Sequence, residues 1–276
     1  MNVTLPQAVV YGLVQGLTEY LPVSSTGHLR VVQALFGWDD PGAAFSAVIQ
    51  LGTAAAVVIY FWRELLAIFV GWLRGWIHRA DRHHSLEFRM GNYLILATIP
   101  VAVCGVVFAD QIETSARNLW LIASALIVFG IGMWLADRVG SQMRGEEEVN
   151  VTDAAAVGLA QALSLIPGTS RSGATISAGL LRGLDRPTAA RFSFLLSVPA
   201  VVLAGVFEAH HIGETGSAGA GVTGLATIIS FVVGLASIAW LMRYVQRHTL
   251  LLFVVYRVAI GILLIALLAT GVISAT

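Results

Sequence analysis

One polar stretch, Gln15 to Leu29, interrupts an otherwise apolar segment and reads QGLTEYLPVSSTGHL. Pro22 ends any helix that arrives from Leu5, because proline lacks a backbone N–H and clashes with the preceding turn. Serine and threonine are favoured helix N-caps, so the three hydroxyl residues after the proline predict that a helix restarts near Gly27. The stretch therefore predicts a broken helix whose free N–H groups point into a polar pocket. The positive end of a helix dipole makes such a start suitable for an anion.

A second stretch, Leu159 to Thr175, has the same order of residue types and reads LAQALSLIPGTSRSGAT. Leucine, glutamine, leucine, a hydroxyl residue, proline, further hydroxyls and glycine follow one another in both, with a one-residue gap around the proline. Where the first stretch has Ser24, Ser25 and Thr26, the second has Thr169, Ser170, Arg171 and Ser172. The second copy thus supplies a cation that the first lacks.

The composition excludes a soluble domain, since 57% of the residues are hydrophobic and only 12% are charged. A polytopic membrane protein is expected instead. The formal net charge is zero and no basic run with interleaved aromatic residues occurs, so we do not expect nucleic-acid binding. A carboxylate at the bilayer centre costs on the order of 3 kcal/mol, so Glu19 indicates a functional site.

The apolar segments fall into two halves of the same design. Each half begins with a broken hairpin, and its arms are too short to cross about 30 Å of hydrocarbon, so each hairpin should enter and leave by the same face. The first repeat, 1–140, is expected to contain a hairpin at 5–36 and spans at 43–62, 91–109 and 119–137. The second, 150–276, is expected to contain a hairpin at 153–182 and spans at 188–207, 222–242 and 250–271. We interpret 65–77 as an interfacial or partly inserted helix.

Arginine placement predicts the orientation of the spans, because cytoplasmic loops carry an excess of positive charge. The loops 37–42, 110–118 and 208–221 hold one arginine between them, Arg117, and are expected to face outside. The hairpins then enter from opposite faces. The predicted fold is an all-α polytopic membrane protein with an inverted-topology repeat, two re-entrant broken-helix hairpins and about six full transmembrane helices. In such folds the binding site lies where the broken helices meet near the midplane.

The motifs QGLTEYLPVSSTGHL and LIPGTSRSGATISAGLLRG closely resemble the two signature motifs of the bacterial undecaprenyl-diphosphate phosphatase family, which is also associated with bacitracin resistance. The resemblance covers essentially the whole chain, including VIQLGTAAAVV and RFSFLLSVPA. It implies a multi-pass enzyme of the bacterial plasma membrane that removes the terminal phosphate of undecaprenyl diphosphate and recycles the lipid carrier of peptidoglycan synthesis. It also implies a divalent cation, Mg²⁺ or Ca²⁺, and an active site reached from the outer face. The oligomeric state is open, a homodimer included.

The chain departs from the family pattern at Gln15, where many members have a glutamate. An amide can form hydrogen bonds or ligate a cation through its carbonyl, but it cannot act as an essential base. That role therefore falls on Glu19 or His28.

Removing phosphate from a diphosphate requires charge neutralisation, an in-line nucleophile and proton transfer. Arg171 can hold phosphate oxygens bidentately. Ser25 and His28 are three residues apart at a helix start and share one face, so His28 could take the proton from Ser25 and make it a nucleophile that forms a phosphoserine. Alternatively His28 activates water, or attacks phosphorus itself. Glu19 could orient His28 or bind the divalent cation.

The other polar and glycine residues of the two stretches are candidates for binding the substrate: Gln15, Ser24, Thr26, Gly27, Thr169, Ser170, Ser172 and Gly173. Each also has a structural explanation, since the hydroxyl residues can cap helices and the glycines can permit close packing. Arg171 could likewise be a structural counter-ion for Glu19.

Two other classes of function compete with a lipid-diphosphate phosphatase. An anion or lipid transporter or channel is the main alternative, because inverted repeats with broken helices are typical of transporters. The cluster of Ser25, His28 and Glu19 favours the enzyme, since a permeation path needs no nucleophile with an adjacent base. A non-catalytic scaffold would tolerate replacement of all these polar residues.

Overall fold

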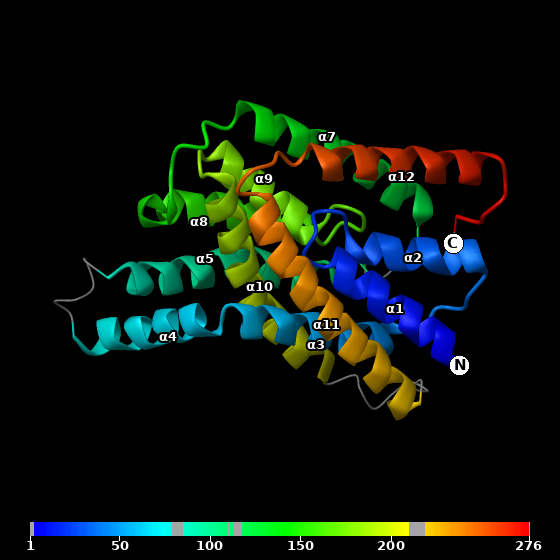
Figure 1. Cartoon of the computed structure of the whole chain (residues 1–276), viewed down its shortest axis with the longest axis horizontal. Coiled ribbons are helices and arrows are strands. Elements are labelled where there is room, and N and C mark those ends of the chain that lie inside the picture. The colour runs from blue at the N-terminus through cyan, green and yellow to red at the C-terminus, as the bar shows by residue number, and fades with distance from the viewer. Residues whose placement is uncertain (1–2, 79–84, 110, 113–117, 210–218, 276) are drawn as a thin grey trace.

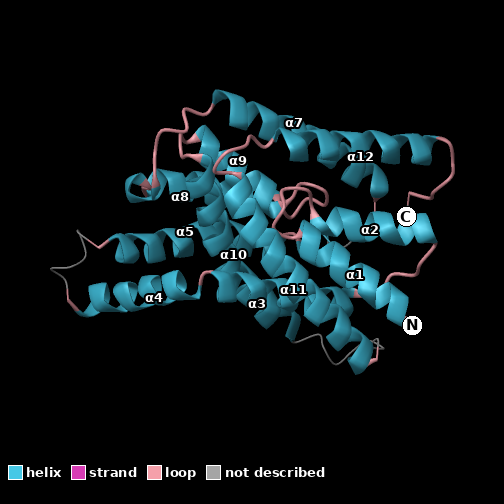
Figure 2. Cartoon of the chain, in the orientation of Figure 1, coloured by secondary structure: helices cyan, strands magenta, loops and turns pink. Residues whose placement is uncertain are grey.

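The computed structural model describes residues 3–78, 85–109, 111–112, 118–209 and 219–275, and this part of the chain is helical with no strand (Figure 1 and Figure 2). Among the described residues, four helices are long and apolar enough to cross a membrane: α5 (Leu86–Val107), α7 (Leu119–Val139), α11 (Ala220–Tyr244) and α12 (Leu251–Ala269). Residues Phe45–Tyr60 of α3 (Ala43–Tyr60) pass the same test together with α4 (Trp62–Ile77), and α10 (Arg186–Ala209) occupies the remaining expected span. The predicted all-α polytopic membrane fold is confirmed.

Two broken hairpins occur at the expected places. The first joins α1 (Leu5–Thr18) to α2 (Ser25–Phe36), and the second joins α8 (Val151–Leu163) to α9 (Arg171–Leu181). The caps Ser24 and Ser170 have the same unusual backbone, with φ of 78° and 74°, in a region that residues other than glycine seldom adopt. This matched geometry supports the repeat, whose boundaries at 1–140 and 150–276 stay a prediction.

The two halves interlock, because the first arm of each hairpin packs along a long helix of the other half. Helix α1 lies against α11, and α8 lies against α5 (Figure 1). A Cβ at Gly12 would meet the carbonyl of Ala226 at 2.6 Å, and one at Gly158 would meet the carbonyl of Ala97 at 2.7 Å. Only glycine permits this approach of the backbones. The packing therefore holds the two hairpin loops near the centre of the molecule.

The segment expected at 65–77 is a longer helix that is packed along a neighbour. One residue, Phe61, separates α3 from α4, and the two helices are bent by 76° relative to each other. Helix α4 lies side by side with α5 (Figure 1). Gly71 and Gly75 of α4 lie against Glu87 and Phe88 of α5. Small residues facing α5 explain the pairing, which periodicity within α4 alone does not reveal.

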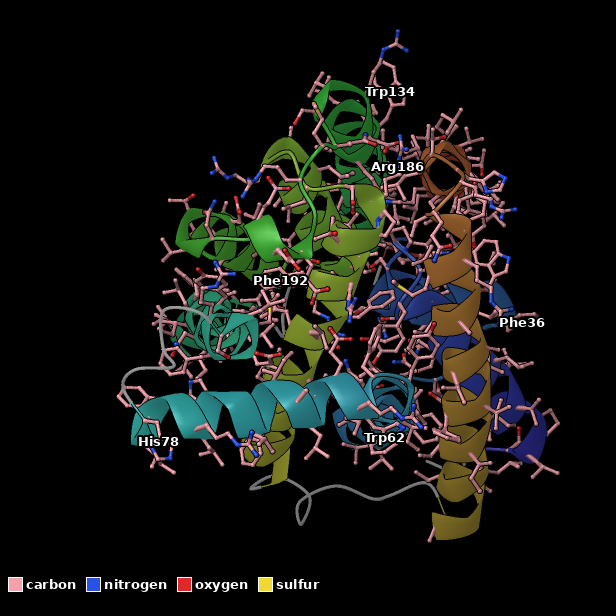
Figure 3. All side chains as sticks on the ribbon, turned by 60° about the vertical axis from the view of Figure 1, so that its left-hand side comes forward. Phe36, Trp62, His78, Trp134, Arg186 and Phe192 are labelled. Atoms are coloured by element: carbon pink, nitrogen blue, oxygen red, sulfur yellow. The ribbon has the colours of Figure 1, made fainter. Side chains whose placement is uncertain are left out.

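Large apolar side chains cover the outside of the bundle as well as its core. Phe36, Trp62 and Trp134 project outward, whereas Phe192 lies inside (Figure 3). Phe36 is 62% exposed and Phe192 is 2% exposed. An outer surface of this kind is suited to lipid rather than water.

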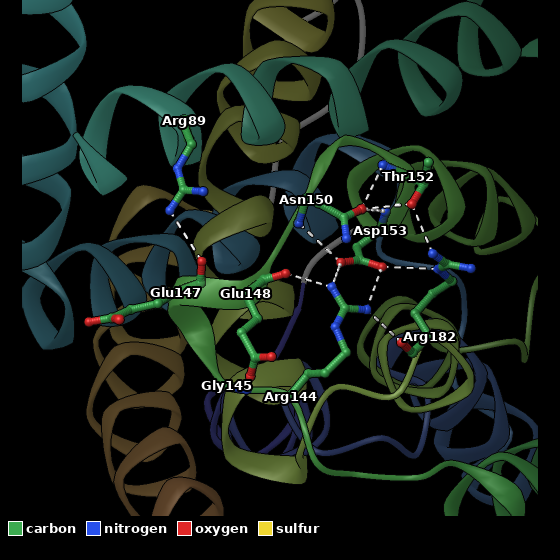
Figure 4. A network of polar contacts seen from close by, with 9 residues as sticks. All are labelled: Arg89, Arg144, Gly145, Glu147, Glu148, Asn150, Thr152, Asp153 and Arg182. Atoms are coloured by element: carbon green, nitrogen blue, oxygen red, sulfur yellow. Dashed lines mark hydrogen bonds and ion pairs between the residues drawn. The ribbon is translucent and has the colours of Figure 1, made fainter. Parts of the chain in front are cut away.

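Ion pairs close the second hairpin at its open end (Figure 4). The buried carboxylate of Asp153, at the start of α8, accepts hydrogen bonds from Arg144 at 2.6 Å and from Arg182, at the end of α9, at 2.9 Å. It also accepts from the backbone N–H of Asn150 at 3.0 Å. One carboxylate thus joins both arms of the hairpin to the segment after α7, which contains the short helix η2 (Glu146–Glu148).

Asp153→Ala should lower the free energy of unfolding by about 3 kcal/mol, because it leaves two arginines and a helix start without their acceptor. The matched control is Asp40→Ala, whose ion pair with Arg30 is more exposed to solvent, and which should cost less than about 1 kcal/mol. Unfolding of the purified variants in mixed micelles measures both. Equal losses would contradict this account.

Candidate functional site

The starts of the two inner half-helices line one cavity of about 200 Å³. The first hairpin contributes Glu19, Ser24, Ser25 and Thr26, and the second contributes Gln161, Ser164, Pro167, Gly168, Ser170 and Arg171. Helices α3, α5 and α10 complete the wall with Gln50, Val101, Ala200 and Val201. The cavity is therefore polar where the hairpins meet and apolar between α5 and α10.

The carboxylate of Glu19 accepts hydrogen bonds from four side chains of this site. One of its carboxylate oxygens accepts hydrogen bonds from the Ser25 hydroxyl at 2.6 Å and from the amide of Gln15 at 3.0 Å. The other accepts from the guanidinium of Arg171 at 2.7 Å and from the amide of Gln50 at 3.4 Å. Its side chain is 5% exposed, so these donors take the place of water around the charge. The ion pair between Glu19 and Arg171 joins the two hairpins.

Ser25 and Arg171 occupy equivalent positions, because each is the first residue of its helix after a serine cap. The first N–H groups of a helix have no carbonyl partner within it. Within the described chain the backbone N–H groups of Ser25, Thr26 and Arg171 have no hydrogen-bond partner, and all three residues line the cavity. The two helix starts therefore offer free N–H groups, the positive ends of two dipoles and one guanidinium to an anion.

His28 does not contact the Ser25 hydroxyl, a contact that one of the three roles considered for it would require. Its Nδ1 lies 2.7 Å from the carbonyl oxygen of Ser24, and its Nε2 lies 2.8 Å from the hydroxyl of Tyr256, whose ring stacks on the imidazole. A carbonyl only accepts, so Nδ1 carries a hydrogen. Side chains in a helix point back toward its start, which is why the imidazole reaches the cap carbonyl instead of the neighbouring hydroxyl. The catalytic role predicted for His28 is left without a test.

The remaining predicted residues fall into two groups. Gln15 is a buried partner of Glu19, and Ser24, Thr26 and Ser170 line the cavity. A second group is not part of the cavity wall: Gly27, Thr169, Ser172 and Gly173. Gly27 and Gly173 donate their N–H groups to the capping serines, and Ser172 donates to the carbonyl of Leu21 in the other hairpin.

Sequence reasoning missed several residues around the site. Gln50 lies in an ordinary apolar segment, and Gln161 belongs to the second repeated stretch, where it corresponds to Gln15 but was not selected as a site residue. Arg257 could have been found, because it is a lone charge inside the apolar span of α12, and the argument that singled out Glu19 applies to it equally. It is fully buried and contacts both hairpin loops.

Metal binding by side chains alone would need a group of suitably placed ligands. Among the described residues, no group of three or more His, Cys, Asp or Glu residues is arranged so that it could hold a metal ion. Glu19 is the one carboxylate among the cavity-lining residues. A divalent cation would need further oxygen ligands from a bound anion, which is how Mg²⁺ usually binds.

Comparison with known proteins places these features in a family context. The sequence model of a family described as "Bacitracin resistance protein BacA" matches residues 8–263. The undecaprenyl-diphosphatase of Mycolicibacterium smegmatis is 49% identical over 273 residues, which is 98% of each chain. That of a Nocardioides species is 50% identical over 270 residues, again 98% of each chain. That of Mycobacterium tuberculosis is 48% identical over 274 residues, covering 98% of this chain and 99% of its own.

The ion pair between the hairpins should be detectable as an energetic coupling. We expect Glu19→Gln and Arg171→Gln each to lower the free energy of unfolding, and the double variant to lower it by about 1–2 kcal/mol less than their sum, since the second change removes a charge already left unpaired. The control pair is Arg171→Gln and Tyr256→Phe. Because Arg171 and Tyr256 share no hydrogen bond, their effects on the free energy of unfolding should add. If the effects of Glu19→Gln and Arg171→Gln on the free energy of unfolding simply add, the result contradicts an ion pair between these residues.

Proposed function

The chain belongs to the family of the bacitracin resistance protein BacA, and from that membership we propose the chemistry of its cavity. It is an undecaprenyl-diphosphatase, a multi-pass membrane enzyme that hydrolyses undecaprenyl diphosphate to undecaprenyl phosphate and inorganic phosphate. The observation that supports our mechanism is the 2.6 Å hydrogen bond from Ser25 to Glu19, beside the contact of Glu19 with Arg171.

The diphosphate lies between the two helix starts. Arg171 and the free N–H groups of Ser25 and Thr26 neutralise its charge. The apolar wall formed by Val101, Ala200 and Val201 suits the first part of the prenyl chain. The arginine-poor loop 37–42 at the open end of the first hairpin supports access from the outer face.

Ser25 is the nucleophile and Glu19 is its base. The hydroxyl gives its proton to the Glu19 oxygen to which it is bonded, and the serine oxygen attacks the terminal phosphorus while the bond from that phosphorus to the bridging oxygen breaks. Undecaprenyl phosphate leaves and receives the proton from Glu19. Glu19 then takes a proton from water, the water oxygen attacks the phosphoserine, and Ser25 leaves and regains that proton. Direct attack by water, with Glu19 as the base, is the competing route.

Glu19 together with the diphosphate oxygens would hold a divalent cation, Mg²⁺ or Ca²⁺. Such a cation neutralises the charge that develops on the departing phosphate. Gln15 contacts the same carboxylate oxygen as Ser25 and keeps that carboxylate in place in the absence of a second acidic residue.

Ser25→Ala should lower kcat for phosphate release from undecaprenyl diphosphate by roughly three orders of magnitude, because it removes the nucleophile. The control is Ser164→Ala, which also lines the cavity but whose hydroxyl donates to a carbonyl of its own helix. Purified protein in detergent with a divalent cation provides the assay. A loss of tenfold or less would assign the attack to water, and silence of the wild type would favour the transporter hypothesis.

Removal of divalent cations should abolish phosphate release without unfolding the protein. The protein supplies a single carboxylate, so the cation is expected to bind only together with the substrate. Chelation should therefore leave the midpoint of thermal unfolding of substrate-free protein unchanged. A clear rise of that midpoint on adding Mg²⁺ without substrate would reveal a cation site built by the protein alone.

A further inference from the structure

Arg257 is a fully buried cation in the middle of α12, and no carboxylate is among its partners in the described chain. Its guanidinium donates to five backbone carbonyls, with donor–acceptor distances of 2.9–3.5 Å. These belong to Pro22, Gly168, Thr169, Ala125 and Leu126. An arginine buried without a counter-ion is costly, so its presence here requires a reason.

The carbonyls that Arg257 contacts in the hairpins have corresponding positions. Pro22 is three residues before Ser25, and Gly168 is three residues before Arg171. Within the described chain, Arg257 is the one donor found for the carbonyls of Pro22, Gly168 and Thr169. These groups are freed by the helix breaks and cannot be left unpaired away from water. The planar guanidinium of Arg257 therefore donates hydrogen bonds to the carbonyl groups that both helix breaks leave free.

The guanidinium also contacts the middle of α7, through Ala125 and Leu126. It thus ties both hairpin loops to a long helix. Gly173 of α9 lies close to it, since a Cβ at that position would be 2.9 Å from Nη1 of Arg257. The fork of donors is rigid, which distinguishes arginine from the flexible point charge of lysine.

We infer that Arg257 is a positioning residue that sets the spacing of the two helix starts, and through them the relative placement of Ser25 and Arg171 on Glu19. It acts through backbone carbonyls and touches no reacting atom. The effect on catalysis rests on the proposed phosphatase function, whereas the effect on the spacing of the hairpins does not.

The spacing can be measured without substrate. Spin labels at Phe36 and Leu181, the exposed last residues of α2 and α9, report the distance between the hairpins in a Cys104→Ser parent. Arg257→Lys keeps the charge but loses the fork, and it should broaden or shift the distance distribution. Gly173→Ala should do the same by displacing the guanidinium. The matched control is Arg243→Lys. Arg243 is exposed near the end of α11, so this change should leave the distance distribution unchanged.

Activity provides the second readout. Arg257→Lys should lower kcat by about 10- to 100-fold per folded molecule, with KM changed by less than about threefold, because small misplacements of reacting groups cost rate rather than binding. A broadened distribution with normal kcat would overturn the catalytic part of the inference. A fall in kcat with an unchanged distribution would overturn the positioning role, and normal values of both would overturn all of it. If the wild type is inactive, the proposed function fails while the distance measurement still decides the role of Arg257.

Discussion

A helix that breaks inside a membrane frees backbone groups that lipid cannot satisfy, and this constraint organises the centre of the molecule. The carbonyls released before each break are bound by Arg257, which comes from a third element, α12. The N–H groups released after each break stay free at the cavity. The fold thus separates the two kinds of orphan group, so that carbonyls are satisfied by the protein and N–H groups are left for a bound anion.

The charges around the cavity follow the same division. Glu19 and Arg171 form an ion pair across the two hairpins, so much of the positive character of the cavity comes from the two helix starts. The proposed diphosphate site therefore needs no cluster of unpaired cations, whose mutual repulsion would destabilise the folded protein. Glu19 contacts the Ser25 hydroxyl through its other oxygen, so its ion pair with Arg171 does not prevent the role of base that we propose for it.

The parts of this site that are local in sequence could be predicted, and those that depend on distant contacts could not. Pro22 and the hydroxyl residues after it predicted the first break, and the matching order of residue types predicted the second, because proline chemistry and capping act within a few residues. The spacing of Ser25 and His28 indicates a shared face but not a contact. The second partner of the imidazole, Tyr256, is 228 residues from His28 and could not be predicted from this spacing. Gln50 reached Glu19 from an ordinary apolar span. Arg257 was predictable in principle, because an intramembrane charge is a signal in any span.

An inverted repeat alone would build a symmetric anion site, whereas the mechanism that we propose uses different residues from the two halves. The equivalent first helical positions have diverged to a hydroxyl in Ser25 and a guanidinium in Arg171. Glu19 stands four residues after Gln15, whereas four residues after Gln161 the chain has Leu165. The base that we propose, Glu19, therefore has no counterpart at the equivalent position of the second stretch. In the proposed mechanism one half of the repeat attacks the phosphate and the other holds it, and this asymmetry favours a phosphatase over an anion pathway, which needs no nucleophile.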